Sequence, residues 1–386
     1  YDRALTTIID ANVTTFLVGI VLYQFGTGPI RGFALTLCIG IVSSLFTAFF
    51  VTRTVFDLLT RTSKKQSLSI GPVAFLSGLN IRFLGKRVYG FTVSGIVLGL
   101  GLISVVAING LRPGIDFAGG TLLELHFDPP LRLEQVRGAL NQVQVGDETI
   151  DLRNNEIKQF GSPNDVLIRI SESEEGTSVA EGVMNALSTK FSENISELDW
   201  IRRQEKVGPR IGEELSSAAV NAVIVALLLI LAYMAWRFHR VLYGIAAVVA
   251  LFHDVLITLG LLSFLDVEIT LAVVAGLLAI VGYSLNDTIV VFDRIRENLL
   301  LTRKEGFAGV IDHSINDCLS RTLITSLTTL VAVVILMLFG GEVNRNFTIT
   351  LFIGVLVGTY SSVFVASPVL YLGHKRSEAK EKGSKA

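Results

Sequence analysis

The chain has 386 residues, of which 51% are hydrophobic and only 17% are charged. Soluble proteins average roughly 25% charged residues, so this composition excludes an ordinary soluble protein and indicates a membrane protein with a modest polar part. The net charge of −1 says little as a total, because the charges are unevenly distributed along the chain. Both cysteines, Cys38 and Cys318, lie in or beside apolar segments, so a disulfide framework is not supported.

Windows of about 20 apolar residues predict eight membrane-spanning helices. In chain order they lie near residues 8–26, 32–55, 88–109, 216–236, 241–264, 269–292, 318–339 and 347–372. The loops orient these helices, because basic residues collect on the cytoplasmic side of a membrane. The segments after the second, fourth, sixth and eighth windows are basic, whereas the intervening short loops lack that excess. Both termini are therefore predicted to be cytoplasmic.

One long polar insertion, residues 113–206, is predicted to form a single domain outside the membrane. It holds nine Lys or Arg and seventeen Asp or Glu, a balance of −8, which argues against nucleic acid or anionic lipid as its partner. Its pattern predicts strand, helix, strand, strand, helix and strand at Gly119–Phe127, Leu133–Val143, Thr149–Phe160, Asp165–Ser171, Val179–Phe191 and Trp200–Val207. This βαββαβ order is the ferredoxin-like plan. The predicted fold class is therefore an α-helical bundle of eight transmembrane helices with one extracytoplasmic α+β domain.

The two ends of the chain resemble each other. A shift that takes Phe25 to Phe339 also takes Phe33 to Phe347 and Gly40 to Gly354 without a gap. Transporters are often built from such repeats, with the working site at the repeat interface. We interpret the chain as a last helix pair of one unit followed by a complete second unit. The divisions are helices at 1–60, a cytoplasmic linker at 61–87, a helix at 88–112, the exterior domain at 113–206, five helices at 207–372 and a cytoplasmic tail at 373–386.

The chain opens with Tyr-Asp-Arg rather than with Met. No basic segment with a cleavage site precedes the first apolar window. We therefore expect the chain to be a piece of a longer polypeptide, with an N-terminal portion of the first unit missing.

Three of the predicted helices carry ionisable residues. Asp287, Asp254 and Arg321 each lie inside an apolar window, where a charge costs roughly 2.5–3.5 kcal/mol on insertion scales. Asp287 and Arg321 are each close to the inner end of the predicted helix, so the two are expected to meet at similar depth. A titratable acid beside a fixed cation is the arrangement that proton passage requires.

Polar neighbours accompany these charges. Asn286 gives the helix of Asp287 a polar side, and Thr325 and Thr328 follow Arg321 at i+4 and i+7. Hydroxyl groups at this spacing, together with water, would carry a proton onward. The candidate relay therefore consists of Asp287, Arg321, Asp254, Asn286, Thr325 and Thr328.

Structural explanations compete with this hypothesis. Asp287 and Arg321 are also compatible with a static buried ion pair, since such pairs are often near neutral for stability. Asp254 and His253 are equally compatible with a hydrogen bond that packs helices, and the threonines with simple helix contacts. Asp10, near the inner end of the first helix, is predicted to be an interfacial residue.

The sequence has no phosphate-binding loop, nucleophile elbow or metal-ligand spacing. A nucleotide-driven motor is therefore not predicted. We expect no cofactor, with protons as the coupling ion, and no enzymatic activity.

Six segments carry a family resemblance. Gly114-Ile-Asp-Phe-Ala-Gly-Gly-Thr121, Val207-Gly-Pro-Arg-Ile-Gly212, the run from Gly282 to Asn298 and Ser320-Arg-Thr-Leu-Ile-Thr-Ser-Leu-Thr-Thr329 closely resemble SecF. The opening Ile9-Asp-Ala-Asn-Val-Thr-Thr15 and the run from Phe25 to Phe33 look like the last two helices of SecD. The chain thus resembles the SecD/SecF family of the resistance–nodulation–division superfamily, as the end of a SecD half fused to SecF.

This resemblance implies a role in protein export. It implies an accessory subunit of the bacterial inner membrane that uses the proton motive force to move or release a polypeptide on the outer face. The implied partners are the SecYEG channel, the missing SecD portion, an unfolded preprotein client and the lipid bilayer, with no nucleic acid. Asp287 would be the titrating acid and Arg321 its partner, while a second family acid lies in a SecD helix that this chain lacks.

Two other functions remain open from the sequence. One is a small-molecule or lipid exporter of the same superfamily, which would need a substrate pocket. The other is a non-conducting structural subunit of the channel complex, which would carry no ion.

Overall fold

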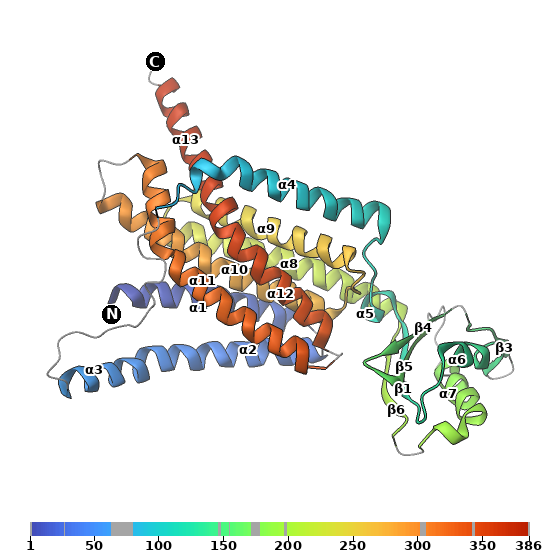
Figure 1. The fold of residues 1–386 in the computed structure, drawn as a ribbon. Helices are drawn as coiled ribbons and strands as arrows, with labels where there is room; N and C mark the ends of the chain where they lie inside the picture. Colours follow the sequence, from blue (N-terminus) through green and yellow to red (C-terminus); the bar gives the residue numbers. More distant parts are fainter. Residues whose placement is uncertain are drawn as a thin grey trace.

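A computed structural model describes residues 2–26, 28–62, 80–145, 148–153, 155–170, 178–196, 199–301, 306–341 and 344–384. Long helices form one bundle, and a small domain of strands and short helices lies beyond one end of it (Figure 1). Both chain ends lie toward the opposite end of the bundle (Figure 1). Within the described residues, eight helical segments are long and apolar enough to cross a membrane, as predicted. Most of the predicted linker, residues 63–79, lies outside the described residues.

The bundle consists of ten α-helices in the described part of the chain. They are α1 (Asp2–Phe25), α2 (Gly28–Phe46), α3 (Thr52–Thr62), α4 (Arg87–Ile103), α8 (Pro209–Phe238), α9 (Val241–Phe264), α10 (Leu271–Leu301), α11 (Phe307–Phe339), α12 (Arg345–Ser361) and α13 (Ser367–Ser384). Three π-helical turns continue them: η1 (Thr47–Val51) joins α2 to α3, η4 (Ser104–Ile108) extends α4, and η7 (Ser362–Ala366) joins α12 to α13. The second predicted span thus continues through η1 into the more polar helix α3, and the last continues through η7 into the more polar helix α13.

Two helices extend well past their predicted ends. α10 runs to Leu301 rather than to 292, and α11 begins at Phe307 rather than near 318. These extensions are polar, so the hydropathy window misses them. They pack against each other through the Asn298 amide, which donates to Ser314 Oγ at 3.0 Å. This hydrogen bond between the two extensions stabilises helical segments that the apolar composition alone does not predict.

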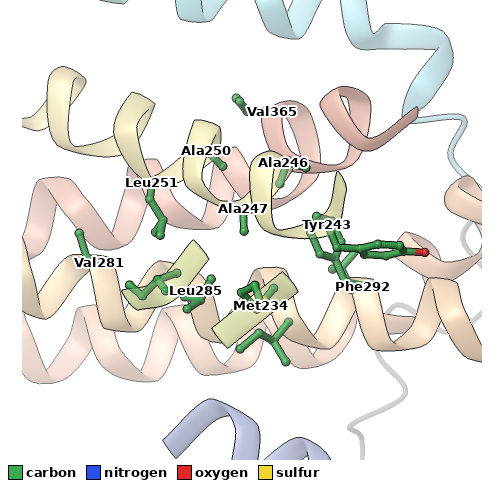
Figure 2. Packing of buried hydrophobic residues seen from close by; sticks show 14 of the residues in the cluster. Met234, Tyr243, Ala246, Ala247, Ala250, Leu251, Val281, Leu285, Phe292 and Val365 are labelled. Carbon is green, nitrogen blue, oxygen red and sulfur yellow. The ribbon is translucent and has the colours of Figure 1, made fainter. Parts of the chain in front are cut away.

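α10 is the central helix of the bundle. It contacts α1, α9, α11 and α12 and is the most buried of the eight spans. A helix that is apolar on all sides is expected to be surrounded by other helices, and the first three turns of α10, from Leu271 to Val281, have this character. Figure 2 shows Leu285 and Phe292 of α10 among Met234 of α8 and the small and large side chains of α9.

The exterior domain begins with the short helix α5 (Ile115–Ala118). Its main sheet has the order β4-β5-β1-β6 with antiparallel neighbours, formed by β1 (Gly120–His126), β4 (Glu156–Phe160), β5 (Ser162–Ile170) and β6 (Ile201–Val207). The helices α6 (Leu133–Ala139) and α7 (Ser178–Lys190) share a core with one face of this sheet, including Leu123 and Ile168. The predicted βαββαβ order of the main elements is present, and the ferredoxin-like classification stays a prediction.

One predicted strand of this domain was wrong. The segment 149–160 was expected to be a single strand, but its start forms β3 (Glu148–Ile150), which pairs with β2 (Val143–Val145) in a separate two-stranded sheet. Helix α6 correspondingly ends at Ala139, before the predicted end at 143. Three-residue strands are too short to show an alternation of polar and apolar residues, so the pattern could not separate them.

The predicted repeat has a counterpart in the packing. Phe33 and Phe347, which the repeat makes equivalent, contact each other edge to face with ring centroids 5.4 Å apart. Equivalent residues meet in this way near a two-fold axis. The contact supports the interpretation that α1–α2 and α11–α12 are related helix pairs.

Helix α4 docks on α9 through a glycine pair. A Cβ atom on Gly101 would lie 3.0 Å from the Cα of Gly260, whereas a Cβ on Gly99 would meet no atom within 4 Å. We predict that Gly101→Leu destabilises the folded protein by about 1–3 kcal/mol, because the added side chain overpacks this contact. The matched change Gly99→Leu should alter stability by less than about 0.5 kcal/mol. Thermal unfolding of the two variants in detergent measures the difference, and equal melting temperatures would contradict the packing described.

Candidate functional site

Asp287 lies in the middle helix α10 with its side chain buried at 6% exposure. The hydroxyl of Ser326 on α11 donates to Asp287 Oδ2 at the long distance of 3.5 Å. Ser326 Oγ in turn lies 2.7 Å from Thr359 Oγ1 on α12 and 3.4 Å from the Tyr283 hydroxyl. Asp287 therefore faces a small hydroxyl network built by three helices, and its carboxylate receives only one weak hydrogen bond from the described residues.

Arg321 lies on α11, one turn and a residue before Ser326, but its side chain is exposed on the surface of the bundle. No ion pair joins Arg321 to Asp287, although both belong to the part of the chain that the structure describes. The direct pairing expected from their depths is therefore absent.

The predicted threonine ladder faces outward. The Thr328 side chain is exposed and that of Thr325 is half-buried, and both hydroxyls lie within hydrogen-bond distance of carbonyl oxygens of their own helix. Asn286 lies beside Asp287, and its Oδ1 atom is buried without a hydrogen-bond donor among the described residues. A buried acceptor without a donor costs about 1–3 kcal/mol, so this position next to the acid is energetically poor. Sequence reasoning missed Ser326 and Thr359, whose hydroxyls are the ones near the acid.

Asp254 has a contrasting environment. Its side chain on α9 is almost fully buried, and the hydroxyls of Ser284 and Ser361 donate to Oδ2 at 2.6 Å and 2.7 Å. His253 Nδ1 lies 2.9 Å from Oδ1, and His253 Nε2 lies 3.0 Å from Ser94 Oγ on α4. This acid is therefore satisfied by α4, α9, α10 and α12 together.

The two acids share helices without sharing a hydrogen bond. Ser284 of the Asp254 cluster lies on α10 one turn before Asp287, and Ser361 lies on α12 two residues after Thr359. Within the described residues, no direct hydrogen bond joins the two clusters. A shift of α10 against α12 would change both environments at once.

Asp10 forms a third charged cluster that the sequence did not reveal. It is buried among the helices, and its predicted location at the membrane interface stays a prediction. The Arg237 Nε–H donates to Asp10 Oδ2 at 2.5 Å and the Tyr233 hydroxyl donates to Oδ1 at 2.7 Å. Arg237 also approaches Asp293 Oδ1 at 3.6 Å. The cluster ties α1 to α8 and α10, and nothing in the spacing of these residues along the chain marks them as neighbours.

A joint connects the exterior domain to the outer end of α10. Asp116 of α5 accepts the Leu271 N–H at 2.8 Å, and the Gly114 N–H donates to the Ile269 carbonyl at 2.7 Å. Burial raises the pKa of the Asp116 carboxyl, while the bond from Leu271 opposes this effect. The domain is thereby attached to the first turn of the helix that carries Asp287.

An ion-pair network reinforces this joint. Lys158 of β4 contacts Glu268, just before α10, at 2.9 Å and Glu156 of its own strand at 3.0 Å. Burial lowers the pKa of Lys158, but the bonds to the two carboxylates outweigh burial and raise it above its ordinary value. Lys158 therefore stays charged at neutral pH, and the cross-joint ion pair persists there.

A glycine pair shapes the same region. Gly119 and Gly120 have φ angles of +72° and +119°, in the left-handed region that favours glycine, where α5 turns into β1. A Cβ on Gly212 of α8 would lie 2.6 Å from the Phe117 carbonyl oxygen. Glycines thus let α5, β1 and α8 meet closely beneath the domain. In the described ranges, no group of three or more His, Cys, Asp or Glu could hold a metal ion.

Comparison with known proteins gives the family. Residues 187–376 match the family described as protein export membrane protein SecD/SecF, C-terminal, and residues 105–131 match the SecD/SecF GG motif, which includes the glycine pair Gly119 and Gly120. The protein translocase subunit SecF of Desulfurispirillum indicum is 43% identical over 75% of this chain and 90% of its own length. This chain belongs to the SecD/SecF family.

Longer members of the SecD/SecF family match nearly the whole chain. The protein translocase subunit SecDF of Thermus thermophilus is 37% identical over 99% of this chain and 50% of its own length. A crystal structure of SecDF, a translocon-associated membrane protein, from that organism matches with a TM-score of 0.82 at 36% identity, over 97% of this chain and 49% of the other. SecDF in its super-membrane-facing form matches with a TM-score of 0.72. The chain thus spans about half the length of the SecDF relatives.

The Asp10 cluster generates a stability prediction. Arg237→Gln leaves the buried Asp10 carboxylate without its cation, which should destabilise the protein by about 3–5 kcal/mol. The double variant Asp10→Asn with Arg237→Gln removes the uncompensated charge and should recover at least about half of that loss. Thermal unfolding of both variants in detergent measures the effect. A double variant no more stable than Arg237→Gln alone would show that the ion pair is not what the single change disrupts.

Proposed function

We propose that this chain is the proton-driven part of a Sec protein-export accessory, which moves or releases polypeptide on the outer face of the membrane. The observation that carries the proposal is the environment of Asp287, a buried acid in the central helix with one weak hydrogen bond. A group held this loosely can gain and lose a proton at little cost in broken contacts. Names of relatives support the export role, since they are protein translocase subunits.

Asp287 is the titrating acid in this proposal, and the hydroxyls of Ser326 and Thr359 lead toward it. The buried Asn286 Oδ1 marks a position where water or a moving donor would complete the route. Asp254 is already saturated with donors and serves as a fixed polar contact whose neighbours move with α10 and α12. Protons are the coupling ion, and no cofactor takes part.

The exposed face of α11 supports a partner beside this chain. Arg321 and Thr328 lie on the surface of a membrane-spanning helix, where an exposed charge in lipid is costly. The SecDF relatives are about twice as long as the region that matches. We propose that helices of such a SecD portion cover this face and supply an acid to Arg321. The SecYEG channel and an unfolded preprotein are the further proposed partners.

The joint transmits the movement outward. Protonation of Asp287 removes its attraction to the Arg321 charge and lets α10 shift. Asp116 and Glu268 link the outer end of α10 to the exterior domain, so the domain moves with the helix. One charge crossing 100 mV yields about 2.3 kcal/mol, which suffices to bias a domain swing but not to unfold a stable protein.

The proposed location is the bacterial inner membrane, with both termini cytoplasmic and residues 113–206 outside. The arrangement of both chain ends opposite the exterior domain supports this orientation (Figure 1). A small-molecule or lipid exporter would need a substrate pocket among the helices, whereas the cavity of about 600 Å³ lies in the exterior domain. A purely structural subunit would leave the poorly satisfied Asp287 without a purpose.

The first prediction of this proposal concerns Asp287. Asp287→Asn should lower proton-dependent export by about tenfold or more, because the amide cannot exchange a proton with the hydroxyl network. Asp287→Glu keeps an ionisable group and should retain part of the activity. Export is measured with the full-length parent protein in membrane vesicles that hold a proton gradient. Unchanged export by Asp287→Asn in a normally assembled protein would refute the relay.

The second prediction separates the joint from the relay. Glu268→Gln removes the cross-joint ion pair with Lys158, whereas the matched change Glu156→Gln removes a pair within the exterior domain only. Glu268→Gln should lower export about threefold while proton flux continues, since a partly exposed pair contributes less than about 1 kcal/mol. Glu156→Gln should leave both export and proton flux near the wild-type level. Parallel losses in the two variants would show that the joint has no special role.

A further inference from the structure

The exterior domain has an open cleft that takes no part in the joint. The cleft has a volume of about 600 Å³ and lies between the end of α6, strand β2 and helix α7. This volume falls within the range of ligand pockets, roughly 300–1,000 Å³. Five neutral polar side chains and one cation line it, namely Asn141, Gln142, Gln144, Asn185, Thr189 and Lys190.

Two glycines give the cleft its shape. A Cβ on Gly182 of α7 would lie 2.6 Å from the Gln144 carbonyl oxygen, so the backbones of α7 and β2 touch there and form one wall. Gly138 of α6 has the opposite character, because its Cβ would meet no atom within 4 Å. The space beside Gly138 is therefore open and unfilled by any described side chain.

The amide side chains in the cleft are available for binding. Asn141, Gln142, Gln144 and Asn185 are exposed, and none of their side chains forms a hydrogen bond with another described residue. Each amide offers donors and an acceptor together, which matches the N–H and C=O groups of a peptide backbone. The one cation, Lys190, donates to the Gly138 carbonyl at 3.3 Å, so its ammonium group already has a hydrogen-bond acceptor within the domain.

We propose that this cleft binds an extended segment of the exported polypeptide through its backbone amides. The proposal rests on the export role proposed above. An unfolded chain has backbone donors and acceptors without partners, and a neutral amide lining can meet them whatever the side chains are. A lining with a single cation, in a domain of net acidic charge, is poorly suited to anionic lipid or nucleic acid.

Site-specific crosslinking tests the location of the polypeptide. A photoreactive residue is placed at Gln144 or Asn185 of the full-length parent protein, in membranes that hold an export intermediate arrested partway through the channel. Control positions are Glu134 on α6 and Glu181 on α7, which are exposed but do not line the cleft. The cleft positions should crosslink to the exported chain about fivefold more than the controls. Equal crosslinking at all four positions, or crosslinks to another molecule alone, would overturn the proposal.

A blocking variant tests the cleft itself. Gly138→Leu adds a side chain to the open space, where its Cβ meets no atom within 4 Å, and leucine favours a helix more than glycine does, so the domain should stay folded. Crosslinking from Gln144 should fall to the control level in this variant, while Glu134→Leu, which adds the same side chain outside the cleft, should leave it unchanged. The cleft has no such role if Gly138→Leu, with an unaltered melting temperature, crosslinks as well as the wild type.

The crosslinks separate this inference from the proton relay. They are measured on an arrested chain without a proton gradient and do not require Asp287 to act. Unchanged export by Asp287→Asn together with cleft-specific crosslinks would remove the relay and leave the cleft in place. Loss of export in Asp287→Asn without cleft-specific crosslinks would support the relay and exclude polypeptide binding in the cleft.

Discussion

A carboxylate inside a membrane-spanning helix must be compensated, and this requirement governs how the chain is built. The central helix α10 is apolar over most of its length, so it is buried by its neighbours. Every acid that enters this environment is met by groups from other helices, because lipid and apolar side chains offer no hydrogen bonds. The polar contacts between helices therefore gather around the acids.

Three buried acids are compensated to different degrees. Asp254 receives two serine hydroxyls and a histidine, and Asp10 receives an arginine and a tyrosine. Asp287 receives one hydroxyl at 3.5 Å. Breaking either of the first two clusters would leave a buried charge unpaired, which is strongly unfavourable. Of the three, Asp287 alone can change its charge without the loss of strong local contacts, and this difference is why we propose it as the titrating group.

The position of Asp287 is the basis for the mechanical effect that we propose for its charge. Its helix is bonded at the outer end to α5 and β4 of the exterior domain through Asp116 and Glu268. The same helix contributes Ser284 to the Asp254 cluster and Asp293 to the Asp10 cluster. In the proposed mechanism, these contacts restrain a shift of α10 within the bundle, and the joint passes the shift to the exterior domain.

The sequence predicted which helices carry the charged residues but not the direction in which these residues face. Eight apolar windows and the exterior domain follow from composition, since burial in lipid needs long apolar runs. Arg321 lies on the predicted helix, yet its side chain is exposed on the surface of α11, because the rotation of a helix about its axis depends on packing. The contacts of Asp10 and Ser326 could not be predicted for the same reason. Their partners are far away in the chain and are brought together only by the folded bundle.

The central claim is that protonation of Asp287 moves the exterior domain. Spin labels at Glu134 on α6 and Leu338 near the outer end of α11, with Cys38 and Cys318 replaced, report the distance between domain and bundle in the full-length parent protein. Lowering the pH should shift the distance distribution in the otherwise wild-type protein, while Asp287→Asn should remain in the low-pH distribution at every pH. An identical pH-dependent shift in Asp287→Asn would contradict the account.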